Sequence, residues 1–485
     1  MADELGIREK KEQDPNAWYT EIVTKAELID YTEVSGCYIL RPKAQYIWDT
    51  IRTVMDARLK ERGVKNASFP LLIPERLLKT EEEHVEGFTP EVAWVTHAGE
   101  TLLPERLAIR PTSETIMYPA YAKWIRSHKN LPLKLNQWCS VVRWEFKHPM
   151  PFLRSREFLW QEGHTAFATQ QEAEEEAMDI LIGVYKYVYE ELLAVPCIAG
   201  IKTLREKFAG ATHSLSCECY LPIGKAVQGC TSHYLGTNFA KAFNITYTAE
   251  DQQTHHVHQN SWGFSTRAIG VTVMMHSDNK GLILPPRVAQ NRLCILPVFG
   301  KVVDGKSSNA DVIEYCETLA EMLREHDPIV DSREQHTFGF RIADAELSGV
   351  PLRLDVGPKE MVEGKVTLVR RDTGVKESVF VRDLVAYIPQ VLDSIHSNLF
   401  ARAKAVLDGA IVEEHASVER IAALVAEGKI VLTPYDGDGA TDDMIRETTG
   451  GKTLCIPFGK HPEAGAVCVF SGKPARHVVY IGKSL

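Results

Sequence analysis

The side chains with the clearest chemical potential lie in one stretch, VVRWEFKHPMPFLRSREFLWQEGHTAF, at residues 141–167. Arg143 and Glu145 alternate there, so both would point to one face of a β-strand. After a loop, a return strand would bring four more side chains to one face: Phe158, Trp160, Glu162 and His164. Two antiparallel strands would then gather guanidinium groups, carboxylates and flat rings around one cavity that binds anions. An ion-pair ladder on a solvated sheet explains the pattern less well, because solvated faces do not usually hold Phe and Trp between charges.

The elements that would carry these side chains are predicted to form an antiparallel sheet flanked by helices. Short β-type runs with few intervening helices indicate such a sheet; the predicted strands are 68–74, 107–112, 134–146, 156–168 and 269–276. One amphipathic helix is expected over 44–62, with Ile47, Ile51, Val54 and Leu59 at helical spacing. A second is expected over 172–193, with one apolar side formed by Met178, Leu181, Ile182, Tyr185 and Tyr189.

After the proline-containing segment 284–290 the pattern changes to alternating strands and helices. Strands at 292–298, 327–331, 351–357 and 365–371 with helices over 310–325 and 339–349 predict a small α/β module. A long helix over 383–407 leads into a last unit, with a helix over 417–427 and strands at 429–433, 453–458, 466–470 and 477–482. We expect a multidomain α/β (α+β) protein with boundaries 1–285, 286–400 and 401–485.

Composition narrows the class of protein. The chain has 485 residues, 44% of them apolar and 25% charged, with a net charge of −10, which is ordinary globular usage and argues against general disorder. No run reaches the roughly 18 apolar residues of a membrane span, so no membrane partner is expected. The charged start lacks the apolar core of a secretory signal, and ten scattered cysteines suit reduced thiols. These features favour a cytoplasmic location.

Five motifs in order carry a family resemblance: RPTSET (110–115), CSVVRWEF (139–146), QEGHTAF (161–167), QGCTSH (228–233) and NSWGFSTRAIG (260–270). They resemble the motifs of class II aminoacyl-tRNA synthetases, and specifically of prolyl-tRNA synthetases of the eukaryotic and archaeal type. The resemblance covers about 20–485 and is weakest after 410. It implies an antiparallel-sheet catalytic domain, an anticodon-binding domain and a zinc-binding-like C-terminal domain. The implied reaction activates L-proline with ATP to prolyl-adenylate and transfers it to the 3′ end of tRNA(Pro).

The resemblance implies a nucleotide site without a general base, because the attacking proline carboxylate is already an anion. Arg143 would clamp the α-phosphate and the carboxylate, and Arg267 would hold the far phosphates, so these two are the predicted catalytic residues. The full set implied for ATP is Arg143, Glu145, Arg154, Phe158, Gln228, Thr231 and Arg267. Mg²⁺ is expected to bridge phosphate oxygens.

Proline offers an apolar ring and a secondary ammonium with two N–H donors, so its pocket needs acceptors and aromatic walls. The set implied by the resemblance is Phe88, Thr112, Glu114, Arg143, Trp160, Glu162, His164 and His233. Each histidine also fits a satisfied core residue, and Glu114 also fits a plain salt bridge with Arg110.

The segment 351–360 carries Arg353, Asp355 and Lys359, side chains of the types that pair with guanine edges and phosphates. In the family this region reads the proline anticodon. The alternative is an edge strand with ordinary surface charges.

The chain departs from the family pattern near its end. Only Cys455 and Cys468, with His461 nearby, remain in a segment where relatives often hold zinc through four cysteines. Two thiolates fall short of a structural zinc site, so we expect no zinc. The three histidines of 254–258 suit a solvated loop better than a metal, and Cys217 and Cys219 suit buried thiols.

The resemblance also implies a homodimer formed through the motif ending at Pro70, and an enzyme without an editing domain, because only 164–228 separates motifs 2 and 3. Two alternatives stay open. A non-catalytic tRNA-binding paralogue would be expected to lose Arg143 or Arg267, and both are present. A threonyl-type class II synthetase needs a Cys/His zinc set, where this chain offers Trp160 and Glu162.

Overall fold

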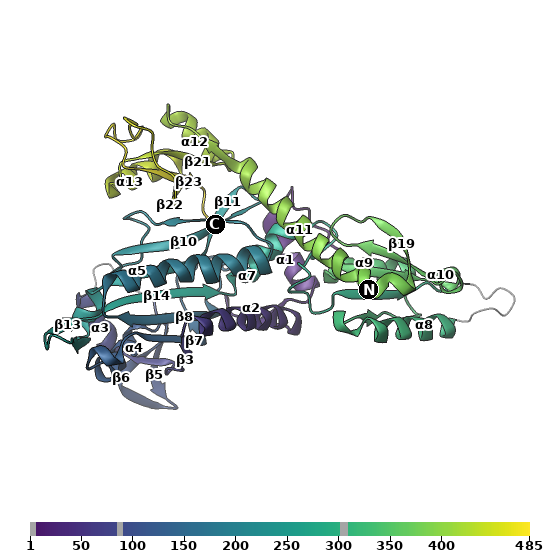
Figure 1. Ribbon diagram of the computed structural model, residues 1–485, viewed down its shortest axis with the longest axis horizontal. Coiled ribbons are helices and arrows are strands. Elements are labelled where there is room, and N and C mark those ends of the chain that lie inside the picture. The colour runs from purple at the N-terminus through teal and green to yellow at the C-terminus, as the bar shows by residue number, and fades with distance from the viewer. Residues whose placement is uncertain (1–5, 85–90, 301–308) are drawn as a thin grey trace.

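The computed structural model of the protein describes residues 6–84, 91–300 and 309–485 (Figure 1). Its centre is an 11-stranded sheet, antiparallel except for the outermost pair at each end. In spatial order its strands are β20 (Ile411–Glu413), β21 (Ile430–Tyr435), β23 (His477–Gly482), β22 (Lys452–Pro457), β9 (Cys197–Ile201), β10 (His213–Leu221), β11 (Lys225–Gly236), β14 (His258–Ser265), β8 (Glu157–Phe167), β7 (Leu133–Val142) and β3 (Lys65–Asn66). The expectation of an antiparallel-sheet core in a mixed α/β protein is confirmed.

Helices cover one face of this sheet. They are α2 (Pro42–Glu61), α5 (Gln170–Asp179) with its continuation over Ile180–Lys186 and Val188–Leu192, and α7 (Arg267–His276). Figure 1 shows α5 and α7 lying across the strands, with α2 alongside. Their apolar sides and the inward side chains of β10, β11 and β14 form the main core, because alternate strand residues point to that face. The opposite face of the strands is left for the site.

Helix α7 replaces the strand predicted over 269–276. Every residue from Ala268 to His276 is buried, because α7 packs against α2, α11 (Leu384–Ala410) and three strands. A short apolar run cannot be assigned to strand or buried helix by periodicity alone. Packing all round the helix outweighs the strand preference of its β-branched residues.

Three smaller expectations also fail. β7 ends at Val142, four residues before the predicted end. Residues 254–258 are not a loop: β13 (Thr254–His256) forms a hairpin with β12 (Thr246–Thr248). The run 466–470 is no strand. In the second predicted amphipathic helix, Met178 and Ile182 are 37% and 39% exposed, and the helix widens to π-turns after residue 179, which changes the spacing of the side chains that follow.

The following α/β module has its own five-stranded sheet and core. Its strands are β16 (Ile329–Val330), β15 (Leu293–Pro297), β17 (Leu352–Val356), β18 (Lys365–Arg370) and β19 (Lys376–Phe380), in that spatial order. The first three are parallel and the last two antiparallel. Helices α8 (Asn309–Met322), α9 (Phe338–Ser348) and α10 (Pro358–Glu363) accompany them.

Helix α11 joins this module to the C-terminal strands, as Figure 1 shows. Its first turns pack Leu384, Ile388 and Ile395 into the core of the module, and its last turn packs Leu407 and Ala410 under β21 and β23. The expected boundary at residue 400 therefore falls inside a continuous helix. Helices α12 (Val418–Ala426) and α13 (Gly439–Thr449) complete this last unit.

The remaining elements are helices, a hairpin and a small sheet outside the two larger sheets. They are α1 (Pro15–Lys25), the hairpin β1 (Ile29–Tyr31) and β2 (Tyr38–Leu40), the small sheet of β4 (Leu72–Pro74), β6 (Thr101–Ile109) and β5 (Trp94–Ala98), and the helices α3 (Glu75–His84), α4 (Glu114–Trp124) and α6 (Asn238–Ala242). Within the described residues, no helix combines the length and the apolar character that crossing a membrane requires.

Candidate functional site

A cavity of about 300 Å³ lies on the sheet face that the helices leave open. It is bordered by β8, β11 and β14, by the segment leading into α4, and by the first residue of α7. Its lining includes eleven of the residues singled out from the sequence: Thr112, Glu114, Arg143, Phe158, Trp160, Glu162, His164, Gln228, Thr231, His233 and Arg267. The fold thus brings together side chains that are up to 155 positions apart in the sequence (267 minus 112).

Arg143 lies directly after the last residue of β7, and its guanidinium lies over the aromatic rings of β8. Its Nε donates to the Pro111 carbonyl at 2.9 Å, and its Cζ lies 5.0 Å from the ring centroid of Trp160 and 5.6 Å from that of Phe158. Within the described residues no other acceptor is recorded for this side chain. The remaining guanidinium donors can therefore bind an anion in the cavity.

Arg267 is the first residue of α7, so its backbone lies at the positive end of a helix. Its side chain donates from Nε to the Leu153 carbonyl at 3.2 Å and from Nη1 to the Gln228 carbonyl at 3.0 Å. Burial lowers the pKa of Arg267, and the charges of Arg143 and Arg154 lower it further. A half-buried pair of like charges in this position favours an anionic ligand between them.

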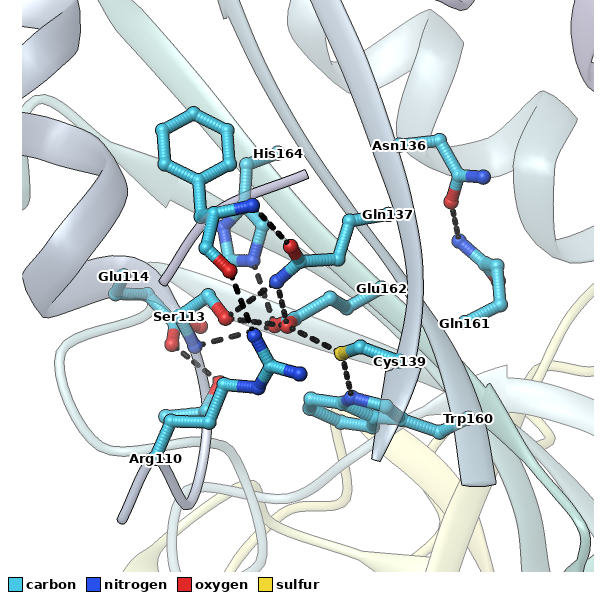
Figure 2. A network of polar contacts seen from close by, with 12 residues as sticks. Arg110, Ser113, Glu114, Asn136, Gln137, Cys139, Trp160, Gln161, Glu162 and His164 are labelled. Carbon is cyan, nitrogen blue, oxygen red and sulfur yellow. Dashed lines mark hydrogen bonds and ion pairs between the residues drawn. The ribbon is translucent and has the colours of Figure 1, made fainter. Parts of the chain in front are cut away.

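Glu162 is the centre of a buried hydrogen-bond network (Figure 2). Its carboxylate accepts bonds from the Ser113 N–H at 3.1 Å, the Ser113 hydroxyl at 2.5 Å and the Gln137 amide at 2.8 Å, and it lies 3.0 Å from Nε2 of His164. The register supports this network, because Gln137 on β7 lies opposite Glu162 on β8. Burial alone would raise the pKa of Glu162, but these donors hold it below its usual value.

His164 completes the network beside Glu162. Burial opposes its protonation, but the carboxylates of Glu114 and Glu162 raise its pKa above the usual value. A protonated ring can donate to Glu162 from Nε2 and to the Tyr118 hydroxyl, 3.2 Å from Nδ1. Because Glu162 is already occupied by protein donors, it orders the cavity wall and is poorly suited to receive a ligand's N–H groups.

Glu114 and Thr112 are better placed as acceptors. Glu114 lies in the first turn of α4, is 3% exposed, and accepts a short hydrogen bond from the Thr112 hydroxyl. His233, on β11, is held by Ser214, whose Oγ is 2.7 Å from Nδ1, and stacks on Phe208 at 4.7 Å between centroids. Burial and the charge of Arg143 lower the pKa of His233 to about 3, so its ring is neutral.

One wall of the cavity has no indication in the sequence: the segment 202–214, which leads from the end of β9 into the first two residues of β10. Lys202, Glu206, Phe208 and Ser214 line the cavity from this segment. Lys202 is buried, with Nζ 2.6 Å from Glu218 and 2.8 Å from the Leu454 carbonyl. No local motif marks these residues; they join the site because the C-terminal strands extend the sheet beside them.

Not every residue predicted for the site lines the cavity. Glu145 is exposed in the loop after β7, so it does not share a strand face with Arg143 as predicted. Arg154 lines a neighbouring cavity of about 690 Å³. Phe88 lies outside the described residues. The plain Arg110–Glu114 salt bridge is not formed, since Arg110 donates to the carbonyls of Ser140 and Phe69.

The residues proposed for the anticodon lie on and after β17. Arg353 and Asp355 are buried and pair with each other, with Nε 2.7 Å from Oδ1, while Lys359 on α10 is exposed. β17 is the central strand of its sheet, so the edge-strand alternative does not hold.

Cys455 and Cys468 belong to two different core clusters, and His461 is exposed. Burial raises the pKa of the Cys455 thiol, which disfavours the thiolate that binds metals. Over the ranges 6–84, 91–300 and 309–485, no three His, Cys, Asp or Glu side chains are grouped to hold a metal ion. Cys217 and Cys219 are buried in the main core.

Three family sequence models match consecutive parts of the chain. They are described as tRNA synthetase class II core domain (G, H, P, S and T), matching residues 99–276, anticodon binding domain, matching 293–391, and prolyl-tRNA synthetase, C-terminal, matching 418–485.

Similar proteins share these parts over nearly the full length. The chain is 46% identical to the cytoplasmic proline–tRNA ligase of Arabidopsis thaliana, over 99% of this chain and 91% of that protein. It is 41% identical to the proline–tRNA ligase of Encephalitozoon cuniculi, over 99% of each chain. The crystal structure of prolyl-tRNA synthetase from Cryptosporidium parvum complexed with halofuginone and AMPPNP superimposes with a TM-score of 0.93 at 41% identity, over 100% of this chain and 98% of that one.

Proposed function

Because the chain belongs to the prolyl-tRNA synthetases, ligases of the class II aminoacyl-tRNA synthetase family, we propose that its cavity binds L-proline and ATP side by side and joins them. The observation that carries the proposal is the convergence of Arg143, Arg267 and the acceptors Thr112 and Glu114 on one cavity. Catalysis is favoured over a non-catalytic tRNA-binding paralogue, because that paralogue would not need both guanidinium groups at the cavity.

The reaction proposed is attack of a proline carboxylate oxygen on the α-phosphorus of ATP. A new O–P bond forms, the bond to the β-phosphate oxygen breaks, and pyrophosphate leaves with the electron pair. Arg143 would hold the α-phosphate and the carboxylate together, which supplies proximity and neutralises charge that develops in the transition state. Arg267 would hold the departing phosphates. No proton has to be removed, so no general base is required.

The nucleotide base would stack on Phe158, with polar contacts from Gln228 and Thr231. Arg154 and Glu145 would approach the nucleotide from the loop after β7; Arg154 is close enough to lower the pKa of Arg267. Few carboxylates line the phosphate end of the cavity, so Mg²⁺ would be held chiefly by phosphate oxygens.

The proline ammonium would donate to Glu114 and Thr112, and Trp160 would wall the ring. Glu162 and His164 would act by ordering that wall. The neutral ring of His233 suits the apolar side of the pocket, because it brings no charge next to the substrate's methylene groups.

The test is ATP–pyrophosphate exchange with each of the twenty amino acids, on the wild-type protein and on Arg143→Ala. We expect exchange with proline, weak exchange with alanine or cysteine, and loss of exchange in the variant. Strong exchange with threonine, or full activity of Arg143→Ala, would contradict the proposal.

For tRNA(Pro), the proposed readers are Lys359 together with Arg353 and Asp355. The three parts of the chain would serve as catalytic, anticodon-binding and C-terminal domains, divided near residues 285 and 400. We also propose a cytoplasmic enzyme, as its Arabidopsis relative is named, without structural zinc; metal analysis of the purified protein checks the last point.

A homodimer is proposed through the motif that ends at Pro70, directly before Leu71 and Leu72. Leu71 and Leu72 are 44% and 37% exposed there, and Tyr31 and Ile39 of the β1–β2 hairpin are each 51% exposed. Contiguous exposed apolar side chains are typical of association surfaces, and Leu71 and Leu72 are adjacent in the chain. Light scattering coupled to gel filtration should give twice the chain mass; a monomer at micromolar concentration would contradict this.

A further inference from the structure

Arg156, the residue just before β8, contacts three separate segments of the chain. Its carbonyl accepts a hydrogen bond from the Arg143 N–H at 2.7 Å, and its own N–H donates to the Gly36 carbonyl at 2.8 Å. Its guanidinium donates from Nη1 to the Ser35 carbonyl and from Nη2 to the Phe146 carbonyl, each at 3.1 Å. Arg156 does not line the cavity.

Two of these contacts close the base of the loop 143–156, which connects β7 to β8. The loop enters at Arg143 and leaves at Arg156, and the bond between their backbones joins its two ends. The side chain reaches back to the Phe146 carbonyl and lies over the Trp144 ring, with Cζ 4.5 Å from the centroid. A planar guanidinium can stack on a ring and donate at its edge simultaneously, and an ammonium cannot.

The other contacts fasten this base to the tip of the β1–β2 hairpin. Gly36 has φ of +84°, and a Cβ added there would lie 2.8 Å from Cγ of Arg156. The close approach therefore requires glycine at the hairpin tip. The N-terminal hairpin thus supports the loop from outside the sheet.

We propose that Arg156 is a positioning residue for the activation reaction: it fixes the base of the loop 143–156 against the hairpin and so sets the place of the Arg143 guanidinium. This inference rests on the proposed role of Arg143 at the α-phosphate. The backbone N–H of Arg143 is held by Arg156, and among the described residues its side chain has one hydrogen bond, to the Pro111 carbonyl, besides its contact with the Trp160 and Phe158 rings. Release of the first support lets the guanidinium drift, and displacements near 1 Å suffice to reduce a rate by about 100-fold.

The alternative role for Arg156 is a general positive charge near the phosphates. The two roles differ in what lysine can replace. A lysine keeps the charge but cannot bridge two carbonyls while stacking on Trp144. They also differ at Gly36, which carries no charge and lies outside the cavity.

The test measures pyrophosphate exchange in Arg156→Ala, Arg156→Lys and Gly36→Ala, with Arg62→Ala as the control. Arg62 is a partly buried arginine of the same domain, in a bidentate pair with Asp179 on the helix side of the sheet. We expect KM for ATP to rise about tenfold in Arg156→Ala and in Gly36→Ala, with a smaller change in KM for proline, and little recovery in Arg156→Lys. Arg62→Ala should lower the melting temperature without changing either KM.

Wild-type KM for ATP in Gly36→Ala, or full activity in Arg156→Lys, would overturn the proposal; these two variants decide it if Arg156→Ala fails to fold. Arg143→Ala is measured in parallel. If it abolishes exchange while the other variants match wild type, only the positioning role fails. If it stays active, the proposed function itself fails.

Discussion

At the scale of single residues, charge in the cavity is decided by neighbours. Glu162 is nearly inaccessible to solvent, yet four protein donors keep it ionised. His164 is buried too, yet two carboxylates raise its pKa above the usual value. His233, of the same residue type and also lining the cavity, is neutral because burial, and then the charge of Arg143, lower its pKa to about 3. Residue type alone therefore says little about the charge that a ligand meets.

The Glu162–His164 pair predicts a pH dependence of stability. Because the pKa of His164 is raised in the folded protein, its protonation stabilises the fold fully below pH 6.5. This stabilisation is lost as the pH rises through the pKa of the folded state. Because the pKa of Glu162 is lowered in the folded protein, its ionisation stabilises the fold fully above pH 4.5. This stabilisation is lost as the pH falls through the pKa of the folded state. The melting-temperature difference between wild type and His164→Gln should thus be largest between these values. A difference independent of pH would contradict the assignment.

Glu114 predicts a selective defect in proline binding. Glu114→Gln removes the charged acceptor proposed for the ammonium, and hydrogen bonds to charged groups are worth about 1.5–3 kcal/mol. KM for proline should rise about tenfold to a hundredfold, with KM for ATP little changed, in steady-state exchange assays. Glu176→Gln is the matched control, because Glu176 is a buried carboxyl on the helix side of the sheet, bonded to Thr165 and Asn260. Equal effects of the two variants would refute the role of Glu114.

At the scale of elements, one wall of the cavity depends on the C-terminal strands. The segment 202–214 lines the site, and Glu206 within it pairs with Arg446 at 2.9 Å and Lys452 at 2.8 Å. β22 pairs with β9 immediately before this segment. The C-terminal unit is therefore part of the framework of the cavity.

The double variant Arg446→Ala/Lys452→Ala should raise KM for proline several-fold, although both residues lie outside the cavity. Single exposed ion pairs contribute little, but these two share one carboxylate that is largely buried. Exchange kinetics provide the measurement. Lys473→Ala serves as control, since Lys473 pairs with Asp438 inside the C-terminal unit. An unchanged KM would show that the segment holds its place without the pairs.

The proposed tRNA-binding residues lie on two elements, β17 and α10, and we expect their substitution to have different effects. Lys359 is exposed, so Lys359→Ala should weaken aminoacylation through KM for tRNA, more at low salt than at high salt, and leave exchange intact. Arg353→Ala should have the same effect with an added loss of stability, of the order of 3–5 kcal/mol, because Asp355 would be buried without its partner. Loss of exchange in Lys359→Ala would argue against a role confined to tRNA.

At the scale of the whole molecule, the stretch between the two central motifs contributes only to the catalytic fold. Residues between His164 and Gln228 form α5, its π-helical continuation, β9, β10 and the wall segment 202–214. They build the core and the cavity and leave no separate body for a hydrolytic domain.

This arrangement predicts that the protein does not edit in cis. A pocket that discriminates proline from alanine by apolar contacts gains only about 1–3 kcal/mol, so alanine should be activated to a measurable degree. In the presence of the pure enzyme, pre-formed alanyl-tRNA should nevertheless be deacylated no faster than in the uncatalysed reaction. Catalysed deacylation in that assay would contradict the prediction.

The sequence by itself determined the family, the antiparallel core and eleven residues of the cavity, because long motifs such as VVRWEF and QEGHTAF fix residue type and strand alternation together. It also located α2, α8, α9 and α11, where apolar spacing is regular.

Only the tertiary structure decided the rest. The apolar run of α7 carries no periodicity that distinguishes a helix from a strand, so its packing against neighbouring elements determines that it is a helix. Glu145 lies outside the cavity because β7 ends at Val142. Lys202 and Glu206 line the cavity beside the C-terminal strands, and Arg156 is held by the β1–β2 hairpin. Contacts between segments far apart in the chain leave no local pattern in the sequence, so they are visible only in the tertiary structure.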